Sequence, residues 1–224
     1  MLERSFLDSI QADPNDELAR LAYADWLEER SDPRADFLRA EAAFFRTGPS
    51  PSFLRVSELA SGIGLDWLAE ASLMAVALRA AWGRVGKGFR CTARVEPGRA
   101  WEESETRLSE LFGGKGFVVP YDYSLFQTLF PGGWFREGGR GVECALWAGE
   151  MVRQRTQDWY EDIEGPPWLS FGAPYSDHEE LFLCCSAADP LFGHVALGGD
   201  DLHILQYHMG AGLAPSFLHY LRSL

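Results

Sequence analysis

The residue types that bind metals are few and scattered in this chain. A zinc site would draw on His203 and His208 with Cys184 or Cys185, because imidazole and thiolate are zinc ligands. The two histidines are five residues apart, which puts them on opposite faces of any strand, and the sequence has no CxxC or HExxH motif. We therefore expect structural histidines and reduced structural thiols, with one of the adjacent cysteines facing the core and the other facing away. We expect no metal and no cofactor.

Other catalytic sites are not singled out by the residues either. A cysteine hydrolase would pair Cys144 with His194, and a two-carboxylate glycosidase would pair Glu161 with Glu179, but many other pairs serve equally well. The glycines between residues 138 and 141 lack the Lys-Ser or Lys-Thr that holds a nucleotide and Mg²⁺. We predict that the chain is not an enzyme. An enzyme of unknown class stays an alternative, and it would require a concave pocket with clustered, perturbed groups.

The charge balance bears on the class of partner. The chain has 33 acidic and 20 basic residues, a net charge of -13, which argues against nucleic acid and anionic membranes and permits a basic protein partner. An apolar fraction of 46% with 8 Trp and 15 Phe predicts a folded chain. No apolar run approaches the roughly 20 residues that span a bilayer, and residues 1 to 7 carry Glu3 and Arg4. We expect a cytoplasmic protein.

Three short helices are predicted over residues 1 to 48. The first ends before the turn at residues 13 to 16, whose Asp and Asn side chains can cap the second helix. The second stops near Pro33, which opens the third. The third has five residues in phase on one face: Phe37, Leu38, Glu41, Phe44 and Phe45.

The remainder is predicted to be a helical connector and an α+β domain. Pro49 to Ser52 reads as a linker, followed by one or two helices within residues 53 to 82. Helices are then expected over 101–112 and 120–130, a strand over 142–147, four short strands from Trp168 onward, and a closing helix from Phe217. The predicted units are a helical module (1–48), a helical connector (49–90) and an antiparallel sheet packed by helices (91–224).

Residues 18 to 39, LARLAYADWLEERSDPRADFLR, closely resemble the repeat-companion module. That module is a short helical unit at the N-termini of large bacterial sets of paralogous proteins, and no activity is attached to it. The resemblance implies an N-terminal unit joined to a variable C-terminal part. For Asp25 and Trp26 within it, we expect a core tryptophan and a carboxylate bound by a backbone group or an arginine.

Residues 101 to 224 resemble the SUKH superfamily. The segments that carry the likeness are WEESETRLSELFGG (101–114), VPYDYSLFQTLFPGGW (119–134), WLSFG (168–172) and the closing SFLHYL (216–221). Val119 stands where the family has Leu before the proline. The resemblance implies a protein-binding α+β domain, because many SUKH proteins are immunity proteins that neutralise a cognate toxin, often a nuclease, while others are regulatory scaffolds.

The candidate partner surface is the acidic, aromatic segment from Gln157 to Trp168, which we interpret as a loop. The stretches 175–180 and 198–201 extend it if neighbouring strand ends converge. The predicted contact residues are Asp158, Trp159, Tyr160, Glu161, Asp162, Glu164, Tyr175, Asp177, Glu179, Asp200 and Asp201. The alternative is a solvated loop with Trp159 packed inward.

Two functions follow as expectations. The first is immunity-like neutralisation of a basic toxin through this acidic surface. The second is an adaptor of a bacterial paralogous set that docks through its N-terminal helices.

Overall fold

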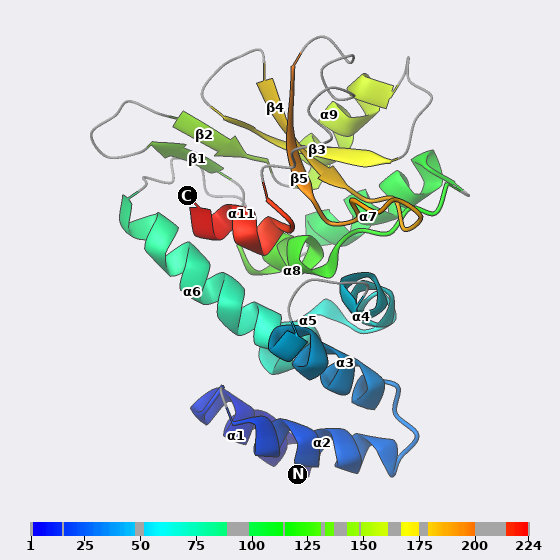
Figure 1. The fold of residues 1–224 in the computed structure, drawn as a ribbon, viewed down its shortest axis with the longest axis vertical. Helices are drawn as coiled ribbons and strands as arrows, with labels where there is room; N and C mark the ends of the chain where they lie inside the picture. Colours follow the sequence, from blue (N-terminus) through cyan, green and yellow to red (C-terminus); the bar gives the residue numbers. More distant parts are fainter. Residues whose placement is uncertain are drawn as a thin grey trace.

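The computed structural model describes residues 2–14, 16–47, 52–88, 99–113, 115–130, 133–136, 143–147, 149–160, 167–174, 179–199 and 214–223. The fold is α+β, with a helical N-terminal region followed by an antiparallel sheet, as the sequence predicts. Figure 1 shows the first helices at one end of the molecule and the sheet at the other, with α8 and α11 between them. The predicted boundaries at 48/49 and 90/91 lie outside the described residues.

The three predicted N-terminal helices are confirmed as α1 (Leu2–Ala12), α2 (Glu17–Glu28) and α3 (Arg34–Thr47). Asp16 caps α2, since its side chain accepts the N–H of Ala19 at 3.0 Å. Trp26 packs against the core, and Asp25 pairs with Arg39 at 2.8 Å. This is the structural role that we expected for both residues.

The connector contains three helices, where one or two were predicted. They are α4 (Ser52–Ala60), α5 (Leu65–Ala71) and α6 (Leu73–Gly88). Ser72 separates α5 from α6 because its backbone is extended, and its Oγ accepts the N–H of Ala75 at the start of α6. A single serine thus ends one helix and begins the next within a stretch where apolar periodicity predicts a continuous helix.

The C-terminal half begins with the two predicted helices, α7 (Arg99–Leu111) and α8 (Tyr121–Leu129). Five antiparallel strands then pair in sequence order: β1 (Gly133–Arg136), β2 (Glu143–Leu146), β3 (Trp168–Pro174), β4 (Glu179–Cys184) and β5 (Val195–Gly199). Three of the four predicted strands after residue 168 are confirmed. The fourth, at residues 202–207, lies outside the described residues.

Two parts of the C-terminal half differ from the sequence prediction. β1 was not predicted, because a strand of four residues that begins with a glycine gives too short a pattern to recognise. Helix α9 (Gly149–Tyr160) contains residues 157–160, so the segment interpreted as a loop begins as the last turn of a helix. In α9, Thr156 Oγ1 accepts the N–H of Ser170 at 3.1 Å, beyond the point where β2 stops pairing with β3. α9 therefore satisfies a backbone group that β2 leaves unpaired.

The main core runs through both halves of the chain. One cluster of buried apolar side chains includes Leu7 of α1, Phe37 of α3, Phe126 of α8 and Leu221 of α11 (Phe217–Ser223). Helix α8 is central to it, since every residue from Tyr121 to Gln127 is buried. The N-terminal helices are thus packed on the same core as the sheet.

A smaller cluster lies on the opposite face of the sheet and contains Trp168, Phe182, Cys184 and Ala196. The neighbouring Cys185 belongs to the main core, so the two cysteines do face opposite sides of the sheet as alternation predicts. Both thiols are free and fully buried, however, because both faces are covered at this point. Within the described part of the chain, no helix is long and apolar enough to cross a membrane.

Candidate functional site

Few of the predicted partner residues can be placed. Asp158 is exposed on α9, Trp159 and Tyr160 belong to the last turn of that helix, and Glu179 is the half-buried first residue of β4. The others lie outside the described residues: Glu161, Asp162, Glu164, Tyr175, Asp177, Asp200 and Asp201. Their positions along the chain show which strand ends they adjoin.

Two of the three acidic stretches leave the sheet side by side. Glu179 pairs with Gly199 across β4 and β5, so residues 175–178 and residues 200–201 continue from neighbouring strand ends. The strand ends from which these two stretches continue are therefore neighbours. We call residues 175–180 and 198–201 the sheet-end segments.

The third acidic stretch joins the sheet at the opposite end. Residues 161–167 lead into Trp168, which pairs with Cys184 at the far end of β3. β3 is seven residues long, and at about 3.3 Å per residue its two ends are separated by about 20 Å. The segment from Gln157 to Trp168 thus reaches the sheet away from the sheet-end segments.

Glu41 of α3 is a buried carboxylate that accepts three hydrogen bonds in the core. Its carboxylate accepts the N–H groups of Leu73 and Met74, at the start of α6, at 2.8 and 3.0 Å. It also accepts the hydroxyl of Tyr121, the first residue of α8, at 2.5 Å. One carboxylate therefore joins α3, α6 and α8, at a helix N-terminus where negative charge is favoured. Burial raises the pKa of Glu41, and these hydrogen bonds oppose the increase.

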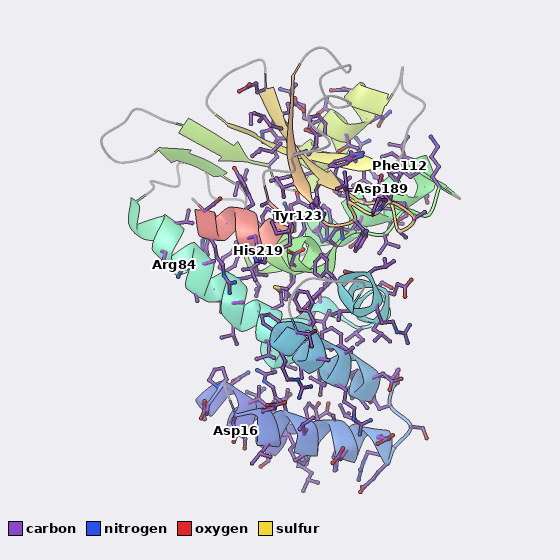
Figure 2. The ribbon with its side chains drawn as sticks, in the orientation of Figure 1. Asp16, Arg84, Phe112, Tyr123, Asp189 and His219 are labelled. Atoms are coloured by element: carbon purple, nitrogen blue, oxygen red, sulfur yellow. The ribbon has the colours of Figure 1, made fainter. Side chains whose placement is uncertain are left out.

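Asp122 joins α8 to the last helix, α11, through its carboxylate. Its Oδ2 accepts the N–H of Leu218, in the first turn of α11, at 3.0 Å, and its Oδ1 is buried without a hydrogen-bond partner. Burial raises the pKa of Asp122 to about 7, although backbone N–H groups of residues 122, 123, 217 and 218 oppose the increase. The next residue, Tyr123, lies among the side chains between α8 and the sheet (Figure 2). Asp122 is thus a buried cap for a helix 96 residues away.

A cleft of about 390 Å³ opens between the α4–α5 turn, α7 and the start of α8. Its apolar lining includes Ile63, Leu65 and Val119, while Ser61, Glu105 and other hydroxyl residues supply polar atoms. The sequence gives no signal for this cleft, because it is assembled from three segments that are each ordinary helix termini or helix faces.

The groups considered for metal or nucleophilic chemistry are only partly described. Burial raises the pKa of the Cys184 thiol to about 12, and it also raises the pKa of Cys185, so both stay protonated at neutral pH and are weak nucleophiles. His203 and His208 lie outside the described residues, as does the Cys144 side chain. Among the residues that the structure describes, no group of three or more His, Cys, Asp or Glu is placed to hold a metal ion.

Sequence reasoning missed the roles of Glu41 and Asp122. Glu41 did give a signal, because it is a carboxylate on the apolar face that Phe37, Leu38 and Phe44 form. A charged residue on a buried stripe needs a partner, and here the partners are backbone groups 32 and 33 residues away. For Asp122 the sequence signal was only its position in the first turn of a helix. The helix dipole favours an acidic residue there, so that position indicates no further role.

Comparisons with protein-family models, with curated proteins and with solved structures found no significant match for this chain.

Proposed function

We propose that this chain is a non-enzymatic, protein-binding module that recognises a basic protein partner through acidic segments at the end of its sheet. The observation that carries the proposal is the pairing of Glu179 with Gly199. This pairing makes neighbours of the two strand ends from which the acidic stretches continue, and these stretches contain Asp177, Asp200 and Asp201 in addition to Glu179. The proposal agrees with the resemblance of residues 101–224 to SUKH proteins, and within that family it favours an immunity-like role.

The physical basis of recognition is electrostatic. A chain with net charge -13 attracts a basic partner over distances comparable to the Debye length, about 8 Å at physiological salt. A row of carboxylates imitates the phosphates that a nuclease cleft binds, so such a surface both speeds encounter and blocks the cleft. A nuclease-type toxin is therefore the partner class that fits this surface best.

The buried ionisable groups support a binding role over a catalytic one. Glu41 and Asp122 are engaged by backbone N–H groups of α6 and α11, and the two thiols are buried. Each of these groups has a structural use in holding helices or filling the core. The acidic groups left for recognition are therefore those of the surface.

The test is charge reversal at the sheet-end segments. The triple variant Asp177→Lys, Asp200→Lys and Asp201→Lys changes the net charge by six without touching the described core. The first candidate partner is the product of the gene adjacent to this one, and its dissociation constant for the purified chain would be measured by calorimetry. We expect the variant to weaken binding at least about tenfold, through several lost charge pairs of about 1 kcal/mol each.

A matched control has the same change of net charge elsewhere. Asp36, Asp66 and Glu103 are exposed on α3, α5 and α7, and their triple replacement by Lys should leave binding within about threefold through screening of distant charges. Equal weakening by both triples would show a general effect of net charge and contradict the assigned surface. A third triple, at Glu161, Asp162 and Glu164, reports separately on the other end of β3.

A second candidate, the adaptor that docks through its N-terminal helices, is favoured by one observation. Leu2 of α1 and Leu18 of α2 are exposed apolar side chains, with 59% and 78% of their surface accessible. Leu18→Glu should abolish assembly and leave the free energy of unfolding unchanged if this surface docks the chain. Deletion of residues 1 to 48 is unsuitable as a test, because it would remove Phe37 and Glu41 from the shared core.

A further inference from the structure

Helix α1 covers an aromatic groove at the end of the molecule opposite the sheet (Figure 1). Tyr23 of α2 is fully buried there, and its ring lies 6.2 Å from that of Trp67 in α5. Phe6 of α1 stacks on Tyr23 at 5.2 Å and contacts Trp26 of α2 at 5.7 Å. We call the surface formed by Tyr23, Trp26, Arg34 and Trp67 the α1 groove.

The floor of the α1 groove is held by contacts that do not involve α1. Trp67 Nε1 donates to the hydroxyl of Tyr23 at 3.0 Å, and the Trp67 ring packs edge-on against Phe37 of α3 at 6.1 Å. Asp32 orients Arg34, since its carboxylate accepts Nε at 2.9 Å and Nη2 at 2.6 Å. The guanidinium of Arg34 also lies 5.1 Å from the centre of the Trp67 ring. The groove is therefore preformed, which favours binding of a helix there.

One end of the α1 groove binds a carboxylate. Glu3, in the first turn of α1, accepts two hydrogen bonds through Oε1: from Arg34 Nη1 at 2.8 Å and from the Tyr23 hydroxyl at 2.8 Å. The Arg34 and Glu3 side chains are only 25% and 38% exposed, so water shields this pair incompletely. Charge-assisted hydrogen bonds of this kind are stronger than neutral ones. Arg34 thus selects an acidic residue at the start of the bound helix.

The contact that α1 makes with the groove is narrow. Only Leu7 and Ile10 are buried among its described side chains, Glu3 and Phe6 are half-buried, and the others are exposed. The ion pair of Arg4 with Glu70 joins two largely exposed side chains and adds little. A helix of 11 residues is marginal in water by itself, so α1 is helical because the groove holds it. Such segments open locally before the rest of a fold unfolds.

We propose that α1 is an exchangeable occupant of the α1 groove, and that a partner protein docks by placing an amphipathic helix of the same pattern there. The pattern is a carboxylate in the first turn followed by apolar side chains three, four and seven residues later, as Glu3 is followed by Phe6, Leu7 and Ile10. The carboxylate pairs with Arg34 and the apolar side chains cover the aromatic floor, which is the helix-in-groove mode of recognition. The inference deepens the second candidate function, the adaptor, and rests on it for the existence of a docked partner.

The test supplies α1 as a separate peptide to the full chain. A fluorescein-labelled peptide of residues 1–13 is titrated with the chain, and fluorescence anisotropy gives its Kd. In the wild-type chain the resident α1 competes, so the apparent affinity is reduced by the fraction of chains whose groove is open. Ile10→Ala in the chain weakens the resident helix and leaves the groove unchanged, so the peptide should bind this variant at least about tenfold more tightly.

Matched variants of the chain control for indirect effects. Asp8→Asn, at an exposed position of α1, should change the Kd of the peptide less than about twofold. Glu3→Gln in the chain is a second way to weaken the resident helix, and it should also tighten peptide binding. Circular dichroism verifies that each chain is folded. A peptide that binds no chain, or binds the wild-type, Ile10→Ala and Glu3→Gln chains equally, would overturn the proposal.

The role of Arg34 is tested by a double-mutant cycle. Glu3→Gln in the peptide removes the charge that Arg34 binds and should weaken binding to the Ile10→Ala chain about tenfold. Adding Arg34→Met to that chain should abolish the difference between the wild-type and Glu3→Gln peptides. A difference that persists without Arg34 would show that the peptide binds elsewhere, which contradicts the proposal.

The exchange and the adaptor fail in different ways. If Leu18→Glu abolishes assembly but the peptide never binds, the exchange is wrong and the adaptor stands. If the peptide binds as predicted but Arg34→Met leaves the assembled complex intact, the groove accepts helices of this pattern and its assignment to the partner is wrong.

Discussion

Replacing Tyr121 by Phe tests the structural link between the N-terminal helices and the sheet domain. The substitution removes only the hydroxyl that donates to Glu41 at 2.5 Å and keeps the ring, which packs edge-on against Phe37 with centroids 5.8 Å apart. Because the acceptor is a fully buried carboxyl group, the lost hydrogen bond should cost about 2 kcal/mol, within a range of about 1.5–3 kcal/mol for bonds to charged groups. Two backbone N–H groups still hold Glu41, so the protein should remain folded.

The measurement is native-state hydrogen exchange, supported by urea unfolding. If Glu41 makes α3, α6 and α8 one cooperative unit, Tyr121→Phe should lower the protection of the most stable amides of α2 and α3 as much as that of β3 and β4. Urea unfolding should give the same loss of about 2 kcal/mol with an unchanged m-value. The substitution lies in α8, so an effect on α2 and α3 has to pass through the shared core.

Tyr123→Phe is the matched control on the same helix. Tyr123 is also buried, but its hydroxyl accepts a hydrogen bond from Gln127, a neutral side chain, at 2.8 Å. Its loss should cost about 1 kcal/mol. A Tyr121→Phe effect no larger than the Tyr123→Phe effect, or a loss of protection confined to α8 and the sheet, would refute the assigned role of Glu41.

Three further predictions concern stability and reactivity. The folded-state pKa of Asp122, about 7, lies above its ordinary 3.8, so the folded chain binds the extra proton and stability should fall as pH rises from about 4 to about 7, by at most about 4 kcal/mol from this group. Glu41, whose pKa burial also raises, contributes to the same slope. Urea unfolding at several pH values should show that Asp122→Asn reduces the slope, and an unchanged slope would contradict the prediction. Gly193 has φ +82° and an added Cβ would lie 2.6 Å from Phe53, so Gly193→Ala should cost about 2 kcal/mol in thermal unfolding, whereas Gly83→Ala, with open space in α6, should not destabilise. The Cys184 thiol should react with an aromatic disulfide reagent only as fast as the chain unfolds, and rapid labelling of the native protein would show that it is accessible.

Much of the helical architecture could be predicted from local signals. Apolar periodicity, the cap at Asp16 and the proline at position 33 predict the helices α1 to α3, and each of these signals acts within a few residues. α9 was harder because, among its side chains whose burial is described, only Val152 and Thr156 are buried. α9 packs against α7 and β3. A helix held in this way has little need for a broad apolar face, so apolar periodicity is a weak signal for it.

The polar core could not be predicted, because its partners are distant in sequence. Glu41 and Tyr121 form a hydrogen bond although they are 80 residues apart in the sequence, and Asp122 and Leu218 do so across 96 residues. Neither pair has a local pattern, since each depends on where tertiary packing brings a helix N-terminus. Of the candidate site, the pairing of Glu179 with Gly199 follows from β4 and β5 being adjacent antiparallel strands. The cleft around Glu105 depends on three separate elements and required coordinates.

The most direct test of the account is the salt dependence of binding between the purified chain and its protein partner. We predict that raising NaCl from about 50 to about 200 mM weakens the complex at least about tenfold, because surface charges at the sheet-end segments carry the association. The Asp177, Asp200 and Asp201 triple lysine variant should bind weakly at both salt concentrations. Binding that is equally tight at both concentrations and in the variant would contradict recognition through this acidic surface.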